Sequence, residues 1–204
     1  NNNEIARKLY REAIELDPNY AWAYIMLGWT YNWEATFGWT KSLAGSYEKA
    51  LELANKAISV DGKSAGAYGL LANVYAKTGQ FEKGITAGKK SLSLDPAYAT
   101  GIYQYGNVLR LAGRFNEAIP FLKRAIRLDP MRPTWYLVSL GWAYFGTGQY
   151  EKAVKTFRRM VSQVPKNAFG QTSLGCALIA TGKPEVAVEM LEKASILSPD
   201  PPSW

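Results

Sequence analysis

The fold is decided by the stretch LANVYAKTGQFEKGITAGKKSLSLDP at residues 71–96, because YGNVLRLAGRFNEAIPFLKRAIRLDP at residues 105–130 repeats its pattern 34 residues later. Each copy has two apolar blocks at helical spacing, with a glycine between them and Asp-Pro at the end. A helix must end and reverse near such a glycine, and proline disfavours helix in the residue before it. The pattern predicts a hairpin of two helices.

The same pattern recurs along the chain. The closing prolines lie 34, 35 and 34 residues apart, at Pro96, Pro130, Pro165 and Pro199. Glycines at the expected turns separate the two blocks of each unit, at Gly79, Gly113, Gly148 and Gly182. These matches, with the Leu-Gly or similar pair upstream of each turn, resemble the tetratricopeptide repeat. The resemblance implies an all-α, right-handed superhelical solenoid, in which stacking of hairpins creates the core.

The repeat boundaries predict one array over residues 1–204. Residues 4–18 match the second helix of a repeat whose first helix is missing, and five repeats follow, at 21–62, 65–96, 99–130, 134–165 and 168–199. The first of these contains an insertion at 32–44. Both ends of the array look cut, so we interpret the chain as a fragment of a longer protein. We expect the second repeat to be the softest, because Gly84 and Gly88 each cost a helix roughly 1 kcal/mol.

The composition disfavours catalysis. The chain has no histidine and a single cysteine, Cys176, which removes Ser-His-Asp and Cys-His sites, intrachain disulfides and cysteine metal clusters. We therefore expect no enzymatic activity, no cofactor and no metal. The chain shows no signal peptide and no apolar run long enough to span a bilayer, so we expect a cytoplasmic location and no membrane insertion.

The concave side of such a solenoid is lined by the first helix of each repeat. The residues of these helices that the packing pattern leaves unused are mostly aromatic or amide-bearing. The candidate groove residues are Trp22, Ile25, Trp29, Trp33, Asn73, Tyr103, Asn107, Arg110, Trp135, Trp142 and Phe169. Some of the tryptophans could simply pack on neighbouring helices. The alternative, which we favour, is a groove that binds a peptide or protein partner, with aromatic anchors and with Asn73 and Asn107 bonding the peptide backbone. The lysine and arginine positions of the two-carboxylate clamp that grips chaperone tails hold other residues here.

The net charge of +7 is unevenly distributed. Residues 110–166 contain 11 Lys or Arg and 3 Asp or Glu. Many of these cations follow the apolar positions of second helices, which places them on the outer, convex face. An alternative hypothesis is therefore binding of nucleic acid or another polyanion through residues 114–166. Nucleic acid is the less favoured partner, because no aromatic residues interleave with these charges. A solvated basic face and self-association into homo-oligomers are further alternatives.

Two phrases carry a narrower resemblance. Ala-Thr-Phe-Gly-Trp at 35–39 and Pro-Thr-Trp-Tyr-Leu at 133–137, followed by Leu-Gly-Trp-Ala-Tyr-Phe at 140–145, resemble the C-terminal repeat arrays of bacterial class III adenylate or guanylate cyclases and of related regulators. The resemblance implies the regulatory or assembly part of a larger bacterial signalling protein. Nothing in the chain resembles a cyclase catalytic domain.

Overall fold

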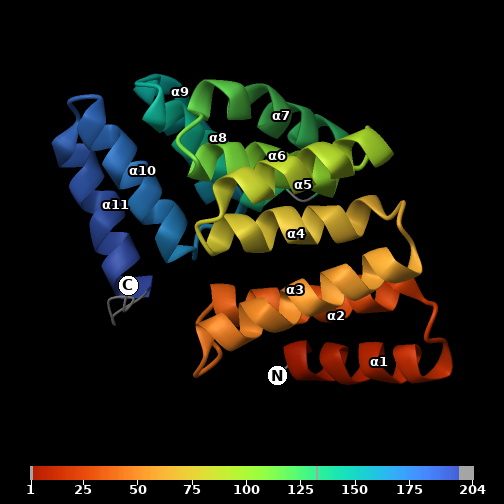
Figure 1. Cartoon of the computed structure of the whole chain (residues 1–204). Helices are drawn as coiled ribbons and strands as arrows, with labels where there is room; N and C mark the ends of the chain where they lie inside the picture. The colour runs from red at the N-terminus through yellow and green to blue at the C-terminus, as the bar shows by residue number, and fades with distance from the viewer. Residues whose placement is uncertain (1, 132, 198–204) are drawn as a thin grey trace. The chain divides into compact units, whose positions relative to one another are not determined.

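The computed structural model describes residues 2–131 and 133–197, which form eleven α-helices and no strand (Figure 1). The helices are α1 (Asn2–Leu16), α2 (Ala21–Thr36), α3 (Leu43–Val60), α4 (Ala65–Lys77), α5 (Phe81–Leu94), α6 (Ala99–Leu111), α7 (Phe115–Leu128), α8 (Pro133–Gly146), α9 (Tyr150–Gln163), α10 (Ala168–Ala180) and α11 (Pro184–Leu197). The prediction of an all-α fold built from helical hairpins is confirmed. The last two residues of the repeat expected at 168–199 lie outside the described residues.

The chain forms two compact units, which meet between Ala112 and Gly113. In the first unit, α2 pairs with α3 and α4 with α5, and the first helices α2, α4 and α6 pack side by side. In the second unit, α8 pairs with α9 and α10 with α11, while α7 packs on α8 and α9 on α10. The first unit therefore has a face made by the consecutive first helices α2, α4 and α6.

Glycine ends the first helix of each hairpin in a left-handed backbone conformation. Gly79 has a φ of +74°, and the next N–H, that of Gln80, donates to the Tyr75 carbonyl at 2.8 Å. This is the helix end that a glycine at the C′ position favours, because it carries no Cβ. Gly38 has a φ of +66° and serves the same role after α2, so only residues 37–42 of the expected insertion at 32–44 lie outside helices. The extra residues mainly lengthen α2 and α3.

Close helix contacts explain the glycines of the second repeat. A Cβ on Gly84 would lie 2.7 Å from Val108 Cγ2 and 3.1 Å from the Ala72 carbonyl oxygen. A Cβ on Gly88 would lie 2.8 Å from Tyr105 Cδ2. Both glycines therefore let α5 approach its neighbours α4 and α6. We expected the second repeat to be the least stable from helix propensity alone. That expectation does not take these packing contacts into account.

The first helix is held by polar groups and by Ile14, which packs against the core of the first unit. None of the α1 residues is fully buried. Arg7 pairs with Glu34 of α2, with 3.1 Å between Nη2 and Oε2, and its guanidinium lies 4.0 Å from the centre of the Tyr31 ring. Ser46 of α3 donates its hydroxyl to the same Glu34 carboxylate at 3.0 Å. This network joins α1, α2 and α3.

Candidate binding surface

Aromatic residues lie around a glycine at one end of the α2–α4–α6 face. Trp22, at the start of α2, is 45% exposed. A Cβ placed on Gly66 of α4 would lie 3.4 Å from Trp22 Cζ3 and 3.6 Å from the hydroxyl oxygen of Tyr98, the residue before α6. The Trp22 ring and Tyr98 therefore lie on either side of the buried Gly66.

The other tryptophans of α2 form a stacked pair. The rings of Trp29 and Trp33 stack with 6.1 Å between their centroids. Trp29 is buried in the core, whereas Trp33 is 39% exposed near the end of α2. Trp33 is thus the member of the pair that a partner can reach.

Two residues that were expected to line the groove are buried instead. Ile25 is 1% exposed and Trp29 is 8% exposed, and both belong to the core of the first unit. The Ile25 Cδ1 would lie 3.4 Å from a Cβ on Gly66, so Ile25 packs against α4. Ile25 supports the surface from below and is not accessible to a partner.

The two asparagines on this face are buried and already hydrogen-bonded. Asn73 donates from Nδ2 to Gln104 Oε1 at 2.8 Å, while its own Oδ1 has no partner among the described residues. The Asn107 Oδ1 accepts from Nε and Nη2 of Arg110, at 3.2 and 2.9 Å. Asn107 therefore holds the Arg110 guanidinium, and the expectation that both amides bind a peptide backbone stays a prediction.

Two cations lie at the end of the face opposite Trp22. Lys77 is the last residue of α4, and Arg110 lies in the last turn of α6. Desolvation by the surrounding protein lowers the pKa of Arg110. Desolvation also lowers the pKa of Lys77, and the Arg110 charge adds to that effect. Lys77 is exposed to solvent, although protein atoms desolvate part of its side chain.

The first helices of the second unit also carry exposed aromatic residues. Trp135 of α8 and Phe169 of α10 are 55% and 46% exposed. Trp142 is half-buried, and its ring meets Phe145 and Phe157 edge-on at centroid distances of 5.3 and 5.7 Å. Trp142 thus contributes to the core of this unit, whereas Trp135 and Phe169 are more accessible.

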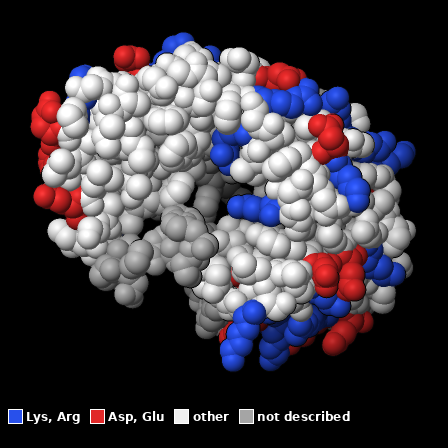
Figure 2. All heavy atoms as spheres, turned by 60° about the vertical axis from the view of Figure 1, so that its left-hand side comes forward, with Lys and Arg blue, Asp and Glu red and all other residues white. Residues whose placement is uncertain are grey.

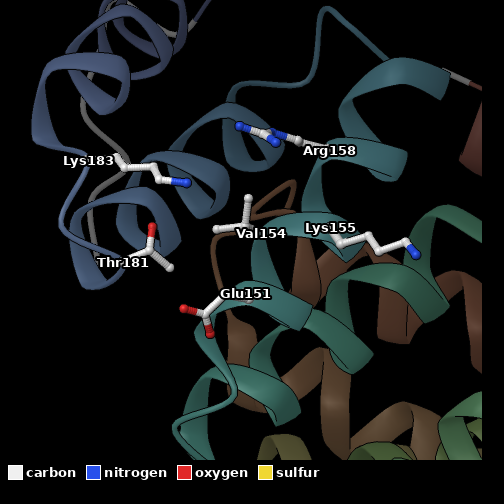
Figure 3. A pocket seen from close by; sticks show the side chains of 6 residues that line it. All are labelled: Glu151, Val154, Lys155, Arg158, Thr181 and Lys183. Atoms are coloured by element: carbon white, nitrogen blue, oxygen red, sulfur yellow. The ribbon is translucent and has the colours of Figure 1, made fainter.

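A shallow basic pocket of about 320 Å³ lies between α9 and the α10–α11 turn (Figure 3). Its lining residues are Glu151, Val154, Lys155, Arg158, Thr181 and Lys183. Figure 3 shows Arg158 and Lys183 pointing toward one another above Val154, while Lys155 points away. None of these six residues is aromatic, so the pocket has no ring on which a nucleic-acid base could stack. On the face drawn in Figure 2, acidic side chains lie beside many of the basic ones.

Family models place the chain among known repeats. Three models, each described as tetratricopeptide repeat, match residues 9–52, 65–98 and 109–172, which together are more than half of the chain. The chain belongs to the tetratricopeptide repeat family. The broad resemblance inferred from the spacing of glycines and prolines is confirmed. No curated protein sequence matches this tetratricopeptide repeat protein.

Solved structures similar to this tetratricopeptide repeat protein have the same fold. YrrB, described as a TPR protein with an unusual peptide-binding site, is 26% identical, with a TM-score of 0.62 over 94% of this chain and 93% of its own. MamA from Desulfovibrio magneticus RS-1 is 22% identical, with a TM-score of 0.67 over 86% of this chain and 97% of its own. The APC/C hetero-tetramer Cut9–Hcn1 is 17% identical, with a TM-score of 0.85 over 99% of this chain and 38% of the matched chain. The last two similarities concern the fold alone.

Sequence reasoning missed two residues of the surface in this tetratricopeptide repeat protein. Tyr98 precedes α6, so counting positions from within each first helix left it out. Lys77 ends α4 and lies one position beyond the last α4 residue that the packing pattern assigned to the groove. A search for lysine or arginine in the last turns of adjacent first helices would have found Lys77 beside Arg110.

Within the described residues, no helix is long and apolar enough to cross a membrane, and no group of three or more His, Cys, Asp or Glu could hold a metal ion.

Proposed function

We propose that this protein is an interaction scaffold whose first unit binds a peptide or protein segment on the α2–α4–α6 face. The observation that carries the proposal is the pair of accessible indoles, Trp22 and Trp33, at the two ends of α2. Tryptophan is over-represented among residues that dominate binding energy.

The similarity to YrrB supports the same interpretation. That protein's peptide-binding site is described as unusual, and at 26% identity the similarity covers nearly the whole of both chains. Trp135 and Phe169 are accessible aromatic residues of the second unit. We propose that they contact a further part of the partner, independently of the first unit.

A displayed library of random peptides tests the proposal. The library is selected against the whole chain, and the recovered pool is bound to Trp22→Ala and Trp33→Ala. Trp39→Ala is the matched control, because Trp39 is an exposed tryptophan in the α2–α3 turn, stacked on Phe37 at 4.9 Å. We expect the first two variants to lose most of the captured pool and the control to keep it. Equal capture by all three variants would contradict the proposed surface.

A specific observation favours self-association as a second candidate function. Ile5, Leu9 and Leu16 of α1 are each more than half exposed, which leaves an apolar stripe on the first helix. Large exposed apolar surfaces often mark contact sites between proteins. Sedimentation of the whole chain against Ile5→Lys is the test: a dimer that the substitution converts to monomer would support it, and a monomeric parent would remove it.

We also propose that the chain is the regulatory or assembly part of a larger bacterial signalling protein. The support is the resemblance of residues 35–39 and 133–145 to the repeat arrays of cyclases and related regulators. The complete reading frame tests this proposal. A cyclase catalytic domain or a winged-helix domain on the same polypeptide would support it, and a frame with neither would contradict it.

A further inference from the structure

The most unusual electrostatic feature of the first unit is a pair of like charges at one end of the α2–α4–α6 face. Lys77 and Arg110 occupy the last turns of α4 and α6, two helices that pack against each other. The Arg110 charge is close enough to disfavour the charged form of Lys77. Trp33 lies near the corresponding end of α2, which also packs on α4.

Neither cation has an acidic partner among the described residues. The Nε and Nη2 groups of Arg110 donate to the Asn107 amide oxygen, and no carboxylate contacts the guanidinium. Lys77 forms no ion pair with any residue that the structure describes. Arg7, the other half-buried arginine of the unit, is by contrast paired with Glu34. A partly desolvated cation without an anion lowers stability, and such local costs are typical of functional sites.

The face therefore has chemically different ends. Trp22 and Tyr98 flank Gly66 at the start of α4, and Trp33, Lys77 and Arg110 lie at the other end. We propose that the segment bound on this face carries an acidic side chain, Asp or Glu, whose carboxylate is bound by Lys77 and Arg110 beside Trp33. This inference rests on the proposed function, because it names the chemistry of the segment that the face binds.

The length of α4 sets the spacing in that segment. Residues 66 and 77 are eleven positions apart in α4, which at a rise of about 1.5 Å per residue corresponds to about 16 Å. An extended peptide advances about 3.3 Å per residue, so about five residues span that length. The bound segment is expected to place a large apolar or aromatic residue about five positions from the acidic one.

The test sequences the peptides that the displayed library yields, with the random segment fused on both sides so that its terminal carboxylate is not free. Affinities of individual recovered peptides are then measured for the parent, Lys77→Met and Arg110→Met, all checked for folding by circular dichroism. Lys89→Met is the matched control, because Lys89 is exposed on α5, a second helix. Loss of a charge-assisted hydrogen bond should weaken binding by roughly tenfold or more in the first two variants and leave the control unchanged.

The outcomes separate this inference from the function on which it rests. Enrichment of Asp or Glu, with weaker binding only in the Lys77 and Arg110 variants, supports the carboxylate site. Peptides that need Trp22 and Trp33 but show no acidic enrichment would overturn the inference and leave the proposed function standing. Acidic peptides that bind Lys77→Met and Arg110→Met as tightly as the parent would also overturn it. Enrichment of no peptide at all would overturn both.

Discussion

Alanine substitutions at two glycines of the first unit should have opposite effects on stability. Gly88 of α5 faces Tyr105 of α6, and a Cβ there would lie 2.8 Å from the Tyr105 Cδ2 and 3.2 Å from its Cα. The Cα is backbone, so relief requires α6 to move. Gly69 of α4 is the matched control, because a Cβ there would meet Ser91 Oγ at 3.7 Å and the Gly101 Cα at 3.8 Å, both ordinary contacts.

The magnitudes follow from two opposing terms. Both glycines lie inside helices, so each alanine gains about 1 kcal/mol of helix propensity. Overpacking at Gly88 costs about 1–3 kcal/mol, which leaves Gly88→Ala less stable than the parent by about 0–2 kcal/mol. Gly69→Ala should be more stable by up to about 1 kcal/mol. Urea unfolding followed by far-UV circular dichroism measures both, and a Gly88→Ala variant at least as stable as Gly69→Ala would refute the packing argument.

Three further predictions concern charged groups. Glu34→Gln breaks the half-buried pair with Arg7 and should lower the free energy of unfolding by about 1–3 kcal/mol. The control is Glu52→Gln, which breaks the exposed pair with Lys49 and should change the free energy of unfolding little. Equal urea midpoints for the two variants would contradict this prediction. Lys77→Met should be more stable than the parent at neutral pH. The folded state lowers the Lys77 pKa, so the charged lysine destabilises the fold, and this destabilisation disappears as the pH rises through the lowered pKa toward 10.5. The difference in free energy of unfolding between Lys77→Met and the parent should therefore shrink in alkaline solution. A difference that grows with pH would contradict this prediction. Arg158→Glu, in the pocket of the second unit, should leave the affinity for selected peptides unchanged in a fluorescence titration, and a marked loss would place part of the binding site there.

The sequence predicted the hairpins because their signals are local. A glycine such as Gly79 ends a helix through its own backbone conformation, and a proline disfavours helix in the residue before it. The regular spacing of these signals was enough to predict the family and the all-α fold. Nothing about the neighbouring helices had to be known.

The direction of individual side chains was harder to predict, because it depends on the neighbouring helix. Ile25 and Trp29 lie on the same helix as the exposed Trp22, yet both belong to the core of the first unit. Lys77 and Arg110 are 33 positions apart in sequence, and only the packing of α4 on α6 brings their charges together. The presence of Gly84 and Gly88 in α5 is likewise explained by contacts with neighbouring helices, which helix propensity does not describe.

The polar attachment of α1 has a consequence for how the molecule opens. Asn3 Nδ2 donates to the Thr30 carbonyl at 3.0 Å, and Arg11 Nη2 to the Tyr31 hydroxyl at 2.7 Å, alongside the Arg7–Glu34 pair. Because no residue of α1 is fully buried, we expect α1 to fray while α2 and α4 stay folded. Its amide hydrogens should exchange with solvent sooner than those of α4, and added salt should speed that exchange. The first helix is then a subglobal unit that unfolds reversibly before the rest of the first unit.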